Sequence, residues 1–128
     1  MRLLLDTHVL LWWHDQPVRL TEAAYGAISD PGNDVFLSVV NGWEIQIKAQ
    51  LGKLTLPKPL HVILQEEQAT NGFRLLPVTI EHVYALDSFP LHHRDPFDRL
   101  LIAQAHQERL ILVTHDSQFS AYSVPLLW

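Results

Sequence analysis

The chain has 128 residues, of which 48% are hydrophobic, and these proportions predict one compact domain with its own core. It has no cysteine, which excludes disulfides, thiolate zinc sites and cysteine nucleophiles. Its formal charge of −5 argues against a broad basic surface for nucleic acid, and divalent cations in an acidic pocket could supply the attraction instead.

The first residues predict a strand followed at once by a helix. Arg2 to Leu5 is a short apolar run that ends at Asp6-Thr7, and residues 8–13 can continue as a helix capped by one of these two side chains. The run is too short for a signal peptide or a membrane span, so we expect a cytoplasmic protein without membrane association.

Strands and helices continue to alternate through the middle of the chain. Thr21 is the expected N-cap of a second helix, which closes in a turn at residues 30–34. Gly52 and Asn71-Gly72 are natural helix stops. The elements expected here are a strand at 35–37, a helix from Ser38 to Gly52, a helix from about Leu60 to Asn71 and a strand from Phe73 to Leu76.

The last third of the chain contains the clearest helix signal. Asp95 is a cap, Pro96 stands at the first helical position and Asp98 lies in the first turn of a helix that runs to Gln107. The other elements expected here are a short helix at 79–86, a strand at 110–113 and a weak edge strand at 123–125. Alternating strands and helices predict an α/β fold with a mostly parallel sheet of four or five strands, covered on both faces.

Four acidic residues occupy positions from which their side chains could meet. Asp6 and Asp116 each lie just beyond the carboxyl end of a predicted strand. Glu44 lies about two turns into the helix after the second strand, and Asp98 opens the helix before the fourth. Ligands of open parallel sheets bind at the carboxyl ends of the strands, so we expect the four carboxylates to share one crevice.

Each acid also has a structural explanation, which stays open. The two strand-end acids could be N-caps, and Asp98 could act with Asp95 at the start of its helix. Glu44 could pair with Lys48, four residues later. Capping alone would not need the crowding, however, because two carboxylates about 5 Å apart repel by about 3 kcal/mol at an effective dielectric near 20.

A Mg²⁺ or Mn²⁺ ion would offset this repulsion, because hard cations choose oxygen ligands. Such an ion would polarise a scissile phosphate and activate water for phosphodiester hydrolysis. We expect Asp6 and Asp98 to be the main ligands. Glu44 and Asp116 would bind through water, or would orient and deprotonate the nucleophile.

Several segments, in order along nearly the whole chain, resemble the PIN-domain family and specifically the VapC-type toxin ribonucleases of bacterial and archaeal toxin–antitoxin pairs. They are Leu4-Leu5-Asp6-Thr7-His8, Ser38 with Trp43-Glu44-Ile45 and Lys48, residues 91–103 around Asp95-Pro96-Phe97-Asp98, and Leu112-Val113-Thr114-His115-Asp116. The resemblance implies a single PIN domain over residues 1–128, folded as a three-layer α/β/α sandwich, with Asp6, Glu44, Asp98 and Asp116 at the family's four acidic positions. One departure is Asn41, which stands where many relatives have a small hydroxyl residue.

The resemblance also implies an activity and partners. It implies a Mg²⁺- or Mn²⁺-dependent endoribonuclease that cuts RNA and is held inactive by a cognate antitoxin, whose tail packs over the active site. It further implies a homodimer, and contact with DNA only through the antitoxin.

Other polar side chains near the acids are weaker candidates. Hydroxyl groups at strand ends could hold a carboxylate or a water, although helix capping explains them equally well; they are Thr7, Ser38 and Thr114. Arg94 and Arg99 could clamp phosphate, or could simply balance nearby acids. His115 could touch substrate or product.

Four interpretations compete with a nuclease. Histidine zinc sites are disfavoured because neither H-E-x-x-H nor an i,i+4 histidine pair occurs. A phosphatase with Asp6 as nucleophile would need an acid at position 8, which is His, and a receiver domain would need paired acids after the first strand. A catalytically inactive module that binds RNA or a partner remains the alternative, preferred if the four acids lie apart.

The adjacent tryptophans Trp12 and Trp13 cannot both be buried on one narrow helix face. We therefore expect one of them to lie at a dimer or antitoxin contact.

Overall fold

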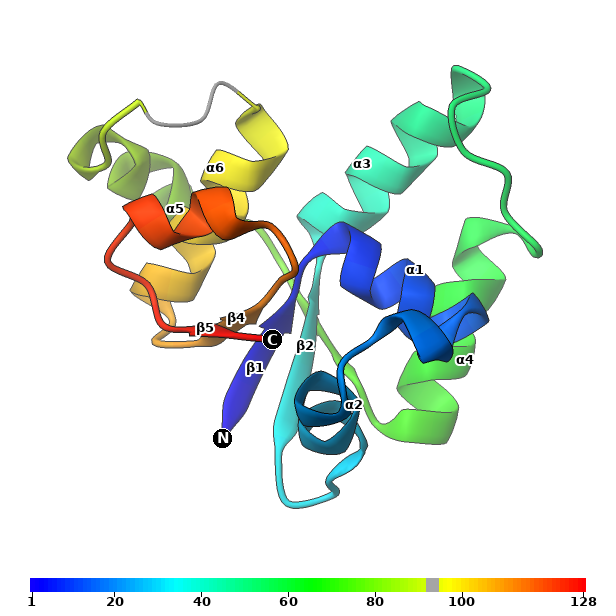
Figure 1. Ribbon diagram of the computed structural model, residues 1–128. Helices are drawn as coiled ribbons and strands as arrows, with labels where there is room; N and C mark the ends of the chain where they lie inside the picture. Colours follow the sequence, from blue (N-terminus) through cyan, green and yellow to red (C-terminus); the bar gives the residue numbers. More distant parts are fainter. Residues whose placement is uncertain (92–94) are drawn as a thin grey trace.

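The computed structural model describes residues 1–91 and 95–128, and its centre is a parallel sheet in the order β3-β2-β1-β4-β5 (Figure 1). The strands are β1 (Arg2–Leu5), β2 (Asp34–Ser38), β3 (Arg74–Leu76), β4 (Ile111–Val113) and β5 (Leu126–Leu127). All the neighbouring pairs are parallel. The predicted sheet of four or five strands is therefore confirmed.

Helices connect the strands in the predicted order. They are α1 (Thr7–Asp15), α2 (Glu22–Ser29), α3 (Val39–Gln50), α4 (Leu60–Asn71), α5 (Ile80–Ala85) and α6 (Pro96–Gln107), with the 3₁₀ turns η1 (Pro17–Arg19), η2 (Leu86–Ser88) and η3 (Ser117–Ala121). Two predicted caps are confirmed. The Thr21 hydroxyl accepts a hydrogen bond from Ala24 N at 3.1 Å, and the Asp95 carboxylate accepts one from Phe97 N at 2.8 Å.

The central strand buries side chains on both faces of the sheet, which explains its unbroken run of leucines. Leu3 and Leu5 belong to a core shared with α1 and α2, whereas Leu4 belongs to a second core shared with α6. Figure 1 shows α1, α2 and α4 on one side of the strands and α6 on the other. This is the three-layer α/β/α sandwich that the sequence predicts. None of the helices in the described part of the chain is long and apolar enough to cross a membrane.

The predicted edge strand at 123–125 is wrong in its position, because β5 begins after Pro125. Proline has no N–H to donate to a ladder. Its carbonyl instead accepts a hydrogen bond from Leu112 N at 2.9 Å, and the regular pairing with β4 starts at the next residue.

The order of the strands reverses beside β1. The chain passes from β1 to β2 and β3 on one side, then crosses to β4 and β5 on the other side. Such a switch point leaves a crevice at the carboxyl ends of the two central strands. Asp6 follows β1 and Asp116 follows β4, so the topology places both acids at this crevice.

Candidate active site

Asp6 is held at the end of β1 by two hydrogen bonds. Its Oδ1 accepts from Thr7 N at 2.7 Å, which caps α1, and its Oδ2 accepts from the Thr114 hydroxyl at 2.8 Å. Burial raises the pKa of Asp6, and the negative charge of Glu44 adds to this, while the two hydrogen bonds oppose it. Asp6 is therefore both a helix cap and an electrostatically crowded carboxylate.

Glu44 enters the same region from α3. Its Oε1 accepts a hydrogen bond from the Thr7 hydroxyl at 2.6 Å, and its Oε2 pairs with Lys48 Nζ at 2.5 Å, so the predicted pair on one helix face is present. Burial alone would lower the pKa of Lys48, but the hydrogen bond to Glu44 and the surrounding carboxylates raise it. Lys48 thus stays protonated beside the acidic site.

Asn41 ties the start of α3 to the end of β1. Its Oδ1 accepts from Ser38 N at 2.7 Å, which completes a capping box in the way that Glu or Gln usually does. Its Nδ2 donates to Leu5 O at 3.1 Å and to the Thr7 hydroxyl at 3.0 Å. The departure from the family pattern therefore changes the hydrogen bonds that support Glu44 and leaves the acid itself in place.

Asp98 lies in the first turn of α6 and is half-buried. Its pKa is raised to about 7, first by burial and then by the negative charges of Asp95, Asp6, Glu44 and Asp116. These charges reach Asp98 because the acids predicted from distant parts of the sequence lie in one place. The four acids are thus near enough to influence one another's charge, and their joint role in catalysis stays a prediction.

Asp116 joins the site through Thr114. The Thr114 hydroxyl, which donates to Asp6, accepts from Asp116 N at 3.0 Å, and Asp116 Oδ1 accepts from Gln118 N at 2.9 Å to cap η3. One hydroxyl therefore fixes two of the acids relative to each other.

The other candidate residues have structural contacts or lie outside the described part of the chain. Ser38 caps α3 and donates from its hydroxyl to Gln104 Oε1 at 2.5 Å, so its contacts match the capping explanation. Arg99 donates to Pro90 O at 3.0 Å and to Leu86 O at 3.2 Å, contacts that favour a structural role over phosphate binding. Arg94 lies outside the described residues, as do His92 and His93.

A cavity of about 250 Å³ opens beside the acids. It is lined by Asp6, His8, Trp12, Arg19, His115 and Asp116. Sequence reasoning considered His115 and did not select His8 or Arg19 as site residues. The i,i+4 spacing of His8 and Trp12, directly after Asp6, was the available signal; η1, which carries Arg19, had no comparable one.

The donor set fits a hard cation, although no metal cluster is ready-made. Within residues 1–91 and 95–128, no three carboxylate or imidazole groups converge closely enough to enclose an ion. Mg²⁺ does not need such a cage, because it usually takes one or two carboxylates and completes its shell with water and substrate phosphate. Burial raises the pKa of Asp6 and of Asp98, and nearby carboxylates add to both shifts, so a cation at this place would favour the ionised forms.

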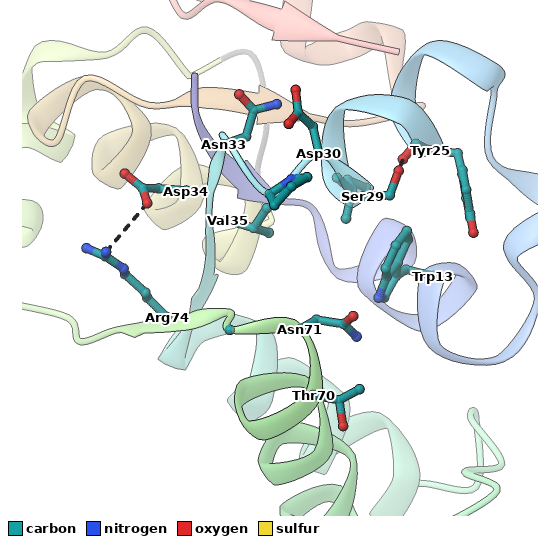
Figure 2. A pocket seen from close by; sticks show the side chains of 13 residues that line it. Trp13, Tyr25, Ser29, Asp30, Asn33, Asp34, Val35, Thr70, Asn71 and Arg74 are labelled. Carbon is teal, nitrogen blue, oxygen red and sulfur yellow. Dashed lines mark hydrogen bonds and ion pairs between the residues drawn. The ribbon is translucent and has the colours of Figure 1, made fainter.

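A larger cavity, of about 540 Å³, lies at the opposite, amino end of the sheet (Figure 2). Asp34 on its wall pairs with Arg74 at 3.5 Å, and Trp13 Nε1, from the same wall, donates to Glu67 Oε2 at 2.8 Å. These groups already have partners, so size alone does not make this cavity the reactive site.

Trp12 and Trp13 lie on different sides of α1, as the sequence predicts. Trp13 packs against Tyr25 and Phe73, with ring centroids 5.3 and 5.8 Å away, while Trp12 packs against His115 and Trp128 at 5.8 and 6.0 Å. Contact of either ring with a partner chain stays a prediction.

Comparison with known proteins identifies the family of the chain. The family model of the PIN domain matches residues 3–125. The chain is 31% identical over 124 residues to Ribonuclease VapC22 of Mycobacterium tuberculosis (strain ATCC 25618 / H37Rv), covering 95% of this chain and 92% of that protein.

Two solved structures share the fold at low sequence identity. VapBC2 from Rickettsia felis, bound to a DNA fragment from its promoter, matches with a TM-score of 0.75 and 14% identity, covering 99% of this chain and 98% of that chain. VapBC-5 from Mycobacterium tuberculosis, a member of the VapBC family of toxin–antitoxin systems, matches with a TM-score of 0.60 and 18% identity, covering 98% and 95%. With the family model matched over nearly its whole length, this chain belongs to the PIN-domain family.

Proposed function

We propose that this chain is a Mg²⁺- or Mn²⁺-dependent endoribonuclease and the toxin of a type II toxin–antitoxin pair. The observation that carries the proposal is the gathering of carboxylates at the switch point of the sheet, where burial and then the neighbouring negative charges raise the pKa of Asp98 to about 7. The ribonuclease named among the relatives supports RNA as the substrate, and the toxin–antitoxin structures support the partner.

Asp6 and Asp98 are the main ligands in this proposal. Both have raised pKa values, so a nearby cation would favour the ionised form of both. When bound, the metal would supply Lewis acidity, which polarises the scissile phosphate and makes water more acidic. Thr114 would keep Asp6 in its ligand orientation through the 2.8 Å hydrogen bond.

Glu44 and Asp116 would orient and deprotonate the attacking water. Thr7 and Lys48 fix the two oxygens of Glu44, so this carboxylate is suited to orienting a water molecule. Asp116 lines the same cavity as Asp6. From this position its carboxylate can accept the proton that the attacking water loses. Hydrolysis then breaks the phosphodiester bond and leaves one new phosphate terminus and one new hydroxyl terminus.

An apolar patch beside the acids supports an antitoxin contact. Trp43, next to Glu44 in sequence, is 56% exposed, and its ring packs edge-on against Phe97 with centroids 5.0 Å apart. Exposed aromatic groups of this kind are typical of protein interfaces. A segment of antitoxin seated on this patch would lie next to Glu44 and Asp98. The homodimer and the cytoplasmic location stay predictions.

The proposal is tested by incubating purified chain with RNA in Mn²⁺, in Mg²⁺ and in EDTA. We expect cleavage with either ion, none in EDTA, and none with Asp6→Asn in any condition. Asp34→Asn, which makes the same change at the other end of the sheet, is the matched control and should cut normally. Cleavage that survives in Asp6→Asn or in EDTA would contradict the mechanism.

A further inference from the structure

The cavity beside Asp6 and Asp116 carries aromatic and guanidinium groups that the proposed chemistry does not use. We propose that it is a nucleobase-binding site, which holds one base of a single-stranded RNA next to the phosphate that is cut. This inference rests on the proposed function, because it assigns a binding site to that substrate.

Trp12 is the centre of the site. The Arg19 guanidinium lies over its ring, with Cζ 4.6 Å from the centroid, and the His8 and His115 rings lie 5.9 and 5.8 Å away. Trp128 supports the ring from a further side at 6.0 Å. Trp12 itself is half-buried and thus fixed, whereas Arg19, His8 and His115 are exposed and can meet a ligand.

Proteins bind single-stranded RNA through aromatic and guanidinium groups of this kind. Unpaired bases stack on aromatic rings and on arginine planes, and the rings tolerate every base because each base has a π-face. Arg19 is also a hydrogen-bond donor in a planar fork. Its side chain is steadied by Trp12 and by a 3.4 Å hydrogen bond to Gln16 Oε1, so little order has to be gained on binding.

The position of the cavity limits the base that it holds to one beside the cut. Asp6 and Asp116 form part of its wall, so a phosphate at the acids and a base against Trp12 belong to neighbouring nucleotides. A second cavity, of about 210 Å³, shares His8, Trp12 and Arg19 with the first and continues toward residues 54–57. The rest of the RNA would follow this second cavity, away from the acids.

A base-binding cavity also explains how a chain with this net charge would hold RNA. A chain with a formal charge of −5 cannot hold RNA mainly by neutralising its phosphates. Stacking does not depend on net charge. Affinity from one or two bases, added to the cation at the acids, would let an acidic protein retain its substrate.

The test combines a change in the RNA with a change in the protein. Short RNAs with a mapped cut are made with an abasic nucleotide at each position flanking the cut. Wild-type chain should lose about 5- to 150-fold in kcat/KM at one flanking position. Arg19→Ala and Trp12→Ala should lose activity on intact RNA and show little further loss on the RNA that is abasic at that position.

Arg74→Ala is the matched control, since it removes an exposed arginine at the other end of the sheet, where Arg74 pairs with Asp34. It should leave kcat/KM and the abasic effect unchanged. Arg19 is exposed, so Arg19→Ala keeps the test valid if Trp12→Ala folds poorly. Protein and RNA changes whose effects multiply independently would overturn the inference, as would equal losses in Arg19→Ala and Arg74→Ala.

Binding of the same RNAs, measured by fluorescence anisotropy, separates this inference from the proposed function. If the wild type binds intact RNA more tightly than abasic RNA, and Arg19→Ala abolishes that difference, the base site stands even when no cleavage is found. If the wild type cuts RNA and binds both RNAs equally, the nuclease stands and the base site fails.

Discussion

The two ends of the parallel sheet both carry acids and a cavity, but they treat charge differently. At the amino end, Asp34 pairs with Arg74 at 3.5 Å (Figure 2). Asp30 accepts a hydrogen bond from Gly32 N at 2.8 Å. At the carboxyl end, burial and then several nearby carboxylates raise the pKa of Asp98 to about 7.

This difference separates structural charge from functional charge. A turn or a strand end is stabilised by a single acid with one partner, and the acids at the amino end follow this pattern. Crowding at the carboxyl end disfavours the ionised folded state, and perturbed carboxylates of this kind cluster at functional sites. The contrast therefore supports a cation-binding role for the carboxyl end of the sheet alone.

The largest effect should come from Asp98→Asn. It removes a proposed ligand, so we expect RNA cleavage to fall at least about 100-fold and the affinity for Mn²⁺ to fall with it. Single-turnover cleavage and Mn²⁺ titration by calorimetry measure the two losses. Asp34→Asn should change neither by more than about 2-fold, and similar losses in both variants would remove the distinction between the two ends.

A smaller loss is expected from Thr114→Val, which keeps the shape of the side chain and removes the hydrogen bond to Asp6 Oδ2. Partners that orient a ligand are typically worth about 10- to 100-fold in activity or metal affinity. Thr114→Ser, which retains the hydroxyl, should stay near wild type. Equal activity in Thr114→Val and Thr114→Ser would show that Asp6 does not depend on this contact.

The local parts of the site could be predicted from sequence. Strand-end acids and helix caps depend on a residue's place within its own element, so Asp6, Asp95 and Asp98 were found from periodicity and capping patterns. The order of strands and helices followed from the same signals. Parallel topology then implied that acids far apart in the chain would meet.

The parts that depend on tertiary neighbours could not be predicted. Whether Arg99 faces a phosphate or the carbonyl of Pro90 is decided by a loop that packs nearby, which no local pattern describes. Asn41 and Thr7 act through contacts that cross between β1 and α3. Arg19 reaches the cavity only because η1 turns the chain back over Trp12.

The effect of pH on stability is the next test of the contrast. The pKa of Asp98 is about 7 in the folded chain, against an ordinary value of 3.8 for an aspartate in water. Between these values the folded state binds more protons than the unfolded state, so the free energy of unfolding falls as pH rises from about 4 to about 7. The loss is complete above pH 7 and absent below pH 4.

In EDTA, Asp98→Asn should therefore gain stability over wild type as pH rises from 5 to 8, by a few degrees in Tm at pH 8. Mn²⁺ should restore the wild type at pH 8 and have little effect on the variant. Thermal melts at each pH measure both effects, with Asp34→Asn as the control. A difference between wild type and Asp98→Asn that does not change with pH would mean that Asp98 is not crowded.

The smallest effect should come from the ion pair at the amino end. The Arg74 and Asp34 side chains are 65% and 48% exposed, so their pairing should contribute less than about 1 kcal/mol and should weaken in salt. A double-mutant cycle with Arg74→Met and Asp34→Asn, followed by urea unfolding at low and high salt, measures this coupling. A larger coupling that salt leaves unchanged would mean that the amino end also holds a desolvated charge pair, and charge crowding would then no longer distinguish the site of chemistry from the rest of the sheet.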